Sequence, residues 1–128
     1  MVTGIGMDLV EIDRVIKACQ KTGKACREAG EACQGAGFLK RYYTEAEIRL
    51  IGEDLTKAAD NFAVKEAVSK MLGTGFRGFT PIDIEVLRDS NGKPFVNLYG
   101  AAKKLAKEQG ISAIHVSIAN TRVLSGAY

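Results

Sequence analysis

Residues 61–75 read NFAVKEAVSKMLGTG, and this stretch decides the fold. Its apolar side chains recur at the spacing i, i+3, i+4, i+7 and i+8, which predicts an amphipathic helix with one buried face. The predicted face consists of Val64, Ala67, Val68, Met71 and Leu72. Gly73 follows at the position where a glycine commonly ends a helix. We therefore predict a central helix from about Thr56 to Leu72, with a turn after it.

The opposite side of this predicted helix is polar. It carries Lys65, Glu66, Ser69 and Lys70. Glu66 and Lys70 are four residues apart, so their side chains lie one above the other on the helix. Residues 73–75, Gly-Thr-Gly, form a turn whose backbone can approach a ligand closely. This combination suits a phosphate group and a metal ion, although a solvated helix face with an ordinary Glu–Lys pair has the same pattern.

Length and composition indicate one soluble domain. A chain of 128 residues can bury a modest core, and a net charge of +3 is too small to indicate nucleic-acid binding. The sequence contains neither an apolar run of membrane-spanning length nor a signal peptide at its start, so we expect a cytoplasmic protein. Three cysteines without a C-x-x-C pair fit a reducing compartment and give little support to a zinc or disulfide site. They are Cys19, Cys26 and Cys33.

The N-terminal residues 2–8, VTGIGMD, alternate in polarity and predict a strand that runs into a helix. Gly4 and Gly6 weaken a strand unless another element packs against the backbone there. Asp8 stands at the end of the predicted strand. It is either a functional carboxylate or the N-cap of the helix that follows.

The helix predicted from Glu11 onwards has an apolar side and a basic side. Its apolar side consists of Ile12, Val15, Ile16 and Cys19. Its basic side, called here the basic stripe, consists of Arg14, Lys17, Lys21 and Lys24. Such a stripe is usually a solvated face, and the alternative is a surface for an anionic partner. RNA is a weak candidate for that partner, because RNA-binding surfaces interleave aromatic residues and this stripe has none.

Further along the chain, local signals predict a helix and a hairpin. The residues TEAE at 44–47 form a capping box, which predicts a helix from Thr44 to about Ile51. Residues 82–86 alternate between apolar and acidic side chains, and residues 95–98 form a second apolar segment. The Asn-Gly pair between these two segments predicts a hairpin.

The C-terminal part predicts another helix and one or two strands. Residues 100–109 have helical periodicity, and residues 114–118 alternate so that His115 and Ser117 point away from the core. Residues 123–128 could begin a last strand. The predicted fold class is α+β, with a mainly antiparallel sheet and helices packed on one face.

Three segments together resemble the holo-[acyl-carrier-protein] synthase family, the small trimeric class of 4′-phosphopantetheinyl transferases. They are GIGMDLVEI at 4–12, FAVKEA at 62–67 and SKMLGTG at 69–75. An aspartate after the first strand combined with an FAxKEA helix is a specific pattern, whereas Gly-x-Gly-x-Asp alone is not. The resemblance spans nearly the whole chain and implies a single phosphopantetheinyl transferase domain over residues 1–128.

This resemblance implies transfer of the phosphopantetheine arm of coenzyme A to a serine of apo acyl carrier protein, as in fatty acid biosynthesis. Asp8 and Glu66 would bind Mg²⁺, a hard cation that prefers oxygen ligands. Lys70 would neutralise the phosphates, and Glu66 would accept the serine proton directly or through a water. The coenzyme A pocket, in a cleft between subunits of a homotrimer, would include Lys65, Ser69, Lys70, Gly73, Thr74, Gly75 and His115. The basic stripe would dock the acidic carrier protein, and neither nucleic acid nor a membrane would be a partner.

Two positions depart from the family pattern. Asn61 replaces an arginine that many relatives have, so Arg41 or another subunit would supply a cation for the nucleotide phosphates. Asn120 replaces a histidine. A lone histidine such as His115 is more often structural than a ligand contact. The alternative function is a non-catalytic module of the same fold that binds coenzyme A or a nucleotide.

Overall fold

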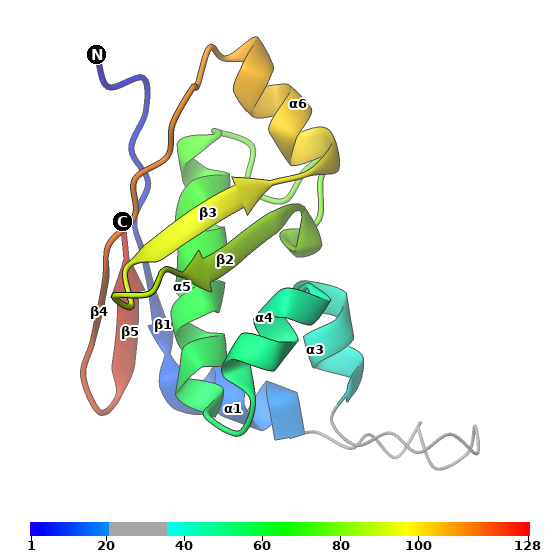
Figure 1. The fold of residues 1–128 in the computed structure, drawn as a ribbon, viewed down its shortest axis with the longest axis vertical. Helices are drawn as coiled ribbons and strands as arrows, with labels where there is room; N and C mark the ends of the chain where they lie inside the picture. The colour runs from blue at the N-terminus through cyan, green and yellow to red at the C-terminus, as the bar shows by residue number, and fades with distance from the viewer. Residues whose placement is uncertain (21–35) are drawn as a thin grey trace.

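The computed structural model describes residues 1–20 and 36–128, and Figure 1 shows its helices and antiparallel strands. The helices are α1 (Ile12–Gln20), α3 (Ala36–Tyr42), α4 (Glu45–Ile51), α5 (Leu55–Met71) and α6 (Gly100–Glu108). The strands are β1 (Asp8–Glu11), β2 (Ile84–Arg88), β3 (Pro94–Leu98), β4 (Ile118–Asn120) and β5 (Leu124–Ala127). A short 3₁₀ turn, η1 (Pro81–Asp83), precedes β2. The α+β class predicted from the sequence is confirmed.

Helix α5 runs through the middle of the molecule and contacts strands of both sheets (Figure 1). It contributes to two clusters of the core, one with β2, β5 and α6 and the other with α1 and α4. The predicted buried face is confirmed, with Met71 only half-buried. On the opposite, polar side, Lys65 and Ser69 have no exposed surface, so neither alternative, a ligand-binding face or a solvated face, applies to their side chains. A helix that is covered on several sides buries polar residues as well as apolar ones.

The strands form two antiparallel sheets. One contains β1, β5 and β4 in that order, and the other is the hairpin of β2 and β3. The predicted last strand is therefore the central strand of its sheet, since β5 pairs with both β1 and β4. Because α5 lies between the two sheets, the helices do not simply cover one face of a single sheet (Figure 1).

The predicted N-terminal strand is shorter than expected, because β1 begins only at Asp8. Residues 1–7 nevertheless run close along α5, and the two glycines make this possible. A Cβ atom placed on Gly6 would lie 1.9 Å from the carbonyl oxygen of Ala67, and one on Gly4 would lie 3.3 Å from that of Met71. The expectation that another element packs against these glycines is therefore confirmed.

The other local predictions agree with the structure. Thr44 and Glu47 form both hydrogen bonds of the capping box at the start of α4. Gly92 has φ +80° in the turn between β2 and β3, which matches the Asn-Gly hairpin signal. Ile114, Val116 and Ile118 pack against the core as predicted, but only Ile118 belongs to β4. Within the described ranges, no helix has the length and apolar character needed to cross a membrane.

Candidate active site

The beginning of β1 and the C-terminal half of α5 bring Asp8 and Lys70 together. The Lys70 ammonium donates to Asp8 Oδ1 at 2.6 Å and to the carbonyl oxygen of Met7 at 3.2 Å. The Asp8 side chain is 14% exposed and the Lys70 side chain 53% exposed. The hydrogen bond to Asp8 raises the pKa of Lys70, so the ammonium form is favoured. Residues 62 positions apart in the sequence thus form one charged cluster.

Glu66 lies one turn before Lys70 on the same side of α5 and completes this cluster. Burial raises the pKa of the Glu66 carboxyl, and the negative charge of Asp8 raises it further. The positive charge of Lys70 lowers this pKa, but by less than burial and Asp8 together raise it. No described side chain forms an ion pair with Glu66. The cluster of Asp8, Glu66 and Lys70 therefore holds two interacting carboxylates and one cation.

The donor set of this cluster fits a hard divalent cation. Among residues 1–20 and 36–128, no three His, Cys, Asp or Glu side chains are grouped as metal ligands. Mg²⁺ commonly uses one or two carboxylates and takes its remaining ligands from water and substrate phosphates. Asp8 and Glu66 satisfy that requirement, and a cation between them would offset the repulsion that raises the Glu66 pKa.

The glycine turn lies at the C-terminal end of α5, directly after the cluster. Gly73 and Gly75 have φ +84° and +58°, values that a residue with a side chain rarely adopts. A Cβ atom at either position would meet no described atom within 4 Å, so the turn has free space around it. Gln109, from the end of α6, donates to the carbonyl oxygen of Leu72 at 2.8 Å and holds the helix end in place. The predicted helix end at Gly73 is confirmed.

Lys65 and Ser69 do not belong to the exposed cluster, which corrects their prediction as coenzyme A contacts. Lys65 is fully buried, and its ammonium donates to Glu47 Oε1 at 2.7 Å, to the carbonyl oxygen of Pro81 at 2.8 Å and to that of Ile84. Ser69 is also fully buried and donates to the carbonyl oxygen of Glu66. A side chain without exposed surface has no atom to offer a ligand.

Lys65 belongs to a buried polar network that the sequence did not reveal. Burial raises the pKa of Glu47 and lowers that of Lys65, and the attraction between the two side chains opposes both shifts. Asn61 donates to Glu47 Oε2 at 3.0 Å and to the carbonyl oxygen of Val86 at 2.9 Å, and it accepts from Arg88 at 2.9 Å. The only sequence signal was Glu47 in the capping box, and that motif carries no information about burial. Asn61 therefore has a structural role here, in the core beside Arg88.

Among the described residues, neither Asn120 nor His115 forms a hydrogen bond with the charged cluster. Asn120 donates to both oxygens of the Asp60 carboxylate, which also accepts from Ser125. His115 is exposed, as predicted, and lines a pocket of about 370 Å³ between residues 1–6 and residues 111–116. None of the three charged residues of the cluster lines this pocket.

The basic stripe is only partly within the described residues. Arg14 and Lys17 are exposed on α1, whose apolar side is buried as predicted. Lys21 and Lys24 lie outside the described residues, as do Cys26 and Cys33. Helix α1 follows β1 without a break, so the exposed part of the stripe begins six residues after Asp8.

Comparison with known proteins relates this arrangement to a family. Residues 4–122 match the 4′-phosphopantetheinyl transferase superfamily. The chain is 53% identical to the holo-[acyl-carrier-protein] synthase of Lachnoclostridium phytofermentans over 128 residues, which cover 100% of this chain and 93% of the relative. It resembles the crystal structure of the Neisseria meningitidis synthase with TM-score 0.79 and 32% identity, over 99% and 95% of the two chains. It also resembles the crystal structure of the Helicobacter pylori synthase in complex with coenzyme A, with TM-score 0.75 and 27% identity. That match covers 96% of this chain and 95% of the Helicobacter pylori chain.

The fold and the family match are those of a group-transfer enzyme, a transferase. The chain belongs to the 4′-phosphopantetheinyl transferase superfamily, among the holo-[acyl-carrier-protein] synthases.

Proposed function

We propose that this chain transfers the 4′-phosphopantetheine group of coenzyme A to a serine of apo acyl carrier protein and releases adenosine 3′,5′-bisphosphate. The observation that carries the proposal is the cluster of Asp8, Glu66 and Lys70 beside an open glycine turn. The names of the relatives and the coenzyme A complex of the Helicobacter pylori synthase support the two substrates. The modified carrier is the form used in fatty acid biosynthesis.

In the proposed reaction, Glu66 accepts the proton of the attacking serine hydroxyl. A carboxylate beside the attacking hydroxyl can accept this proton directly or through a water. Lys70 interacts with the phosphate oxygens and neutralises the charge that develops on the leaving group. Asp8 and Glu66 would together hold Mg²⁺, and the cation would supply further charge neutralisation for the pyrophosphate. The turn of residues 73–75 leaves open space beside the cluster for the nucleotide, while the amides of Gly73 and Gly75 already donate to the carbonyl oxygens of Lys70 and Ser69.

The test is a transfer assay with mass spectrometry. The protein is incubated with coenzyme A, Mg²⁺ and an apo carrier protein, and the mass of the carrier is measured. An increase by one phosphopantetheine group supports the proposal. Binding of coenzyme A without any change in the carrier mass would instead favour the non-catalytic binding module.

We further propose that the chain forms a homotrimer with coenzyme A bound between subunits. The supporting observation is an apolar strip along β1 and the residues before it, where Ile5, Met7 and Leu9 are 84%, 66% and 64% exposed. Leu124 of β5, opposite Glu11 in the ladder, is also exposed. An apolar strip of this kind usually lies in an interface. Sedimentation equilibrium at micromolar concentration should give the mass of three chains, and a monomer would contradict the trimer.

The basic stripe is proposed to dock the acidic carrier protein, and Arg14 and Lys17 allow a direct test. Reversing both charges, Arg14→Glu and Lys17→Glu, should raise the KM for the carrier several-fold at low salt. Exposed charges mainly steer encounter, and each contributes about 1 kcal/mol or less. The salt dependence of the KM should become flatter, while the KM for coenzyme A should stay unchanged.

The matched control for this test is the double reversal Lys104→Glu and Lys107→Glu on α6. These lysines are also exposed on one helix, so the net charge changes equally. If both double variants raise the carrier KM to the same extent, the effect comes from net charge. An unchanged KM for the α1 variant at low salt would mean that the carrier docks elsewhere.

A further inference from the structure

The Lys70 ammonium occupies a cation position beside Asp8. It lies between two oxygen atoms, 2.6 Å from Asp8 Oδ1 and 3.2 Å from the carbonyl oxygen of Met7. Asp8 is one of the two carboxylates proposed to hold the divalent cation. The same carboxylate is therefore the partner of the lysine and the proposed ligand of the metal.

Of the two partners, Lys70 has the more exposed side chain. Asp8 begins β1 and pairs with Ala127 of β5, and its side chain is 14% exposed. The Lys70 side chain is 53% exposed and extends from the last turn of α5 on a long, flexible stem. If the ion pair separates, we expect the Lys70 side chain to move towards solvent while the main chain of Asp8 stays paired with β5.

An ammonium and a divalent cation that both lie against Asp8 repel each other. Two like charges about 4 Å apart repel by about 1 kcal/mol even in bulk water, and by more near a protein surface. Glu66 offers no alternative partner that would relieve this repulsion, because it is itself proposed to hold the divalent cation. The metal and the Lys70 ammonium therefore compete for Asp8, and a metal bound without a phosphate leaves the displaced ammonium without a carboxylate partner.

The glycine turn that follows Lys70 has open space around it. Gly73 follows Lys70 by three residues, and its amide donates to the Lys70 carbonyl oxygen at 3.0 Å. Phosphates bound beside this open turn would lie within reach of the Lys70 stem. We propose that Lys70 holds the cation position at Asp8 in the free enzyme, and that the phosphates of coenzyme A draw it away, so that coenzyme A and the divalent cation bind cooperatively. This inference rests on the proposed function, since it takes Asp8 and Glu66 as the metal ligands.

The inference is tested by Mn²⁺ binding, followed by the electron paramagnetic resonance signal of free Mn²⁺. Without coenzyme A, Lys70→Met should bind Mn²⁺ about five-fold more tightly than wild type, because the competing cation is gone. With saturating coenzyme A and no carrier protein, the two proteins should differ by less than about two-fold, since Lys70 has already left Asp8. In Lys70→Met, the factor by which coenzyme A increases Mn²⁺ affinity should therefore be about five-fold smaller than in the wild type. Binding linkage requires the same reduction in the factor by which Mn²⁺ increases coenzyme A affinity, and this second measurement is an independent check.

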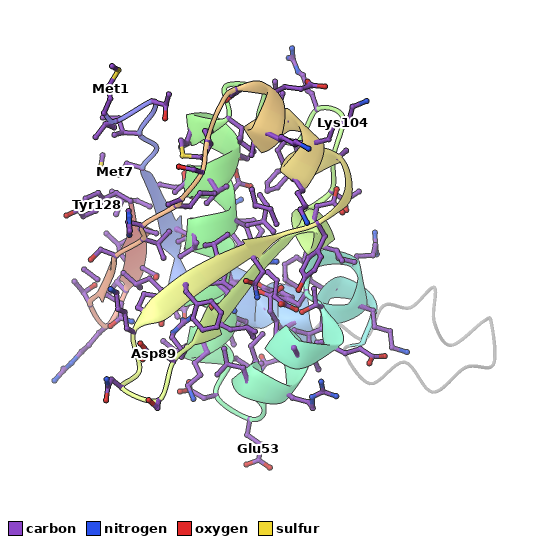
Figure 2. All side chains as sticks on the ribbon, turned by 45° about the horizontal axis from the view of Figure 1, so that its top comes forward. Met1, Met7, Glu53, Asp89, Lys104 and Tyr128 are labelled. Atoms are coloured by element: carbon purple, nitrogen blue, oxygen red, sulfur yellow. The ribbon has the colours of Figure 1, made fainter. Side chains whose placement is uncertain are left out.

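Two further variants separate displacement from a general change of charge. Lys70→Arg keeps a cation at Asp8 and should bind Mn²⁺ as weakly as wild type. Lys104→Met also removes one positive charge, but from α6, far from Met7 and the N-terminal segment in Figure 2. It should leave the Mn²⁺ affinity unchanged.

Three results would overturn the inference. The first is a Mn²⁺ affinity of Lys70→Met that equals that of the wild type without coenzyme A. The second is an equal gain with and without coenzyme A, which would show that Lys70 never leaves Asp8. The third is a wild-type protein that binds coenzyme A but binds no Mn²⁺ when coenzyme A is present. That last result would remove the proposed metal site as well, whereas the first two would leave the proposed function intact.

Discussion

Replacing Glu66 with glutamine is expected to lower kcat for phosphopantetheinyl transfer by at least about 100-fold, while the protein remains as stable as the wild type or becomes more stable. General-base catalysis typically contributes about 10²–10⁴-fold to a rate. Glutamine keeps the size of the side chain but can neither accept the serine proton nor supply a carboxylate to Mg²⁺. Single-turnover transfer in saturating Mg²⁺ measures the loss.

The stability part of this prediction follows from the raised pKa of Glu66. Burial and the charge of Asp8 make the folded protein hold the Glu66 proton more tightly than the unfolded chain does. As the pH rises through the ordinary range for glutamate, the folded state therefore loses stability relative to a variant that cannot ionise. Wild type and Glu66→Gln should unfold alike in acid, and the variant should gain an advantage as the pH approaches neutrality. Thermal unfolding across this pH range measures the difference.

Glu53→Gln is the matched control, since Glu53 is exposed in the loop between α4 and α5 (Figure 2). It should change neither transfer nor the pH dependence of stability. Transfer by Glu66→Gln at a near wild-type rate would remove Glu66 from the proposed mechanism. A variant less stable than wild type at neutral pH would show that Glu66 has a structural partner.

Replacing Lys65 with methionine is expected to destabilise the fold by about 3–5 kcal/mol. Lys65 and Glu47 are both fully buried, and their ion pair is 2.7 Å long. Removing one partner of a buried ion pair leaves the other charge in the core without compensation, which costs about this much. Chemical denaturation at a fixed protein concentration measures the loss, since the stability of an oligomer depends on concentration.

The pH dependence and a second substitution show whether the unpaired Glu47 is the cause. Burial already raises the pKa of Glu47, and the loss of Lys65 removes the main opposing interaction. The destabilisation should therefore be smaller in acid, where Glu47 can take up a proton, and larger at neutral pH. Adding Glu47→Gln to Lys65→Met should recover part of the loss, because no buried charge remains. A Lys65→Met protein within 1 kcal/mol of wild type would contradict the structural role.

The same variant also separates the structural role of Lys65 from a role in binding. Wherever Lys65→Met is still folded, its KM for coenzyme A should match that of the wild type. A raised KM with unchanged stability would return Lys65 to the coenzyme A pocket. Lys104→Met, the substitution of an exposed lysine, should change neither quantity.

Local features of this protein were determined by the sequence itself. The capping box before α4, the Asn-Gly hairpin and the glycine at the end of α5 depend on residues within a few positions of one another. Short-range hydrogen bonds and backbone preferences decide such features, so nearby residues suffice to predict them. The motif around Asp8 and the FAxKEA helix likewise indicated the family, which the comparisons confirmed.

Only the tertiary structure decided which polar residues of α5 face the solvent. Lys65 and Lys70 carry the same ammonium group five positions apart, yet one pairs with Glu47 in the core and the other with Asp8 at the surface. Helical periodicity places both lysines on the polar side, because it contains no information about what packs there. Helix α4 and strand β2 cover Lys65, and the approach of residues 1–7 that Gly6 permits brings Met7 and Asp8 to Lys70. These contacts join segments that are far apart in the chain, and burial and charge pairing depend on them.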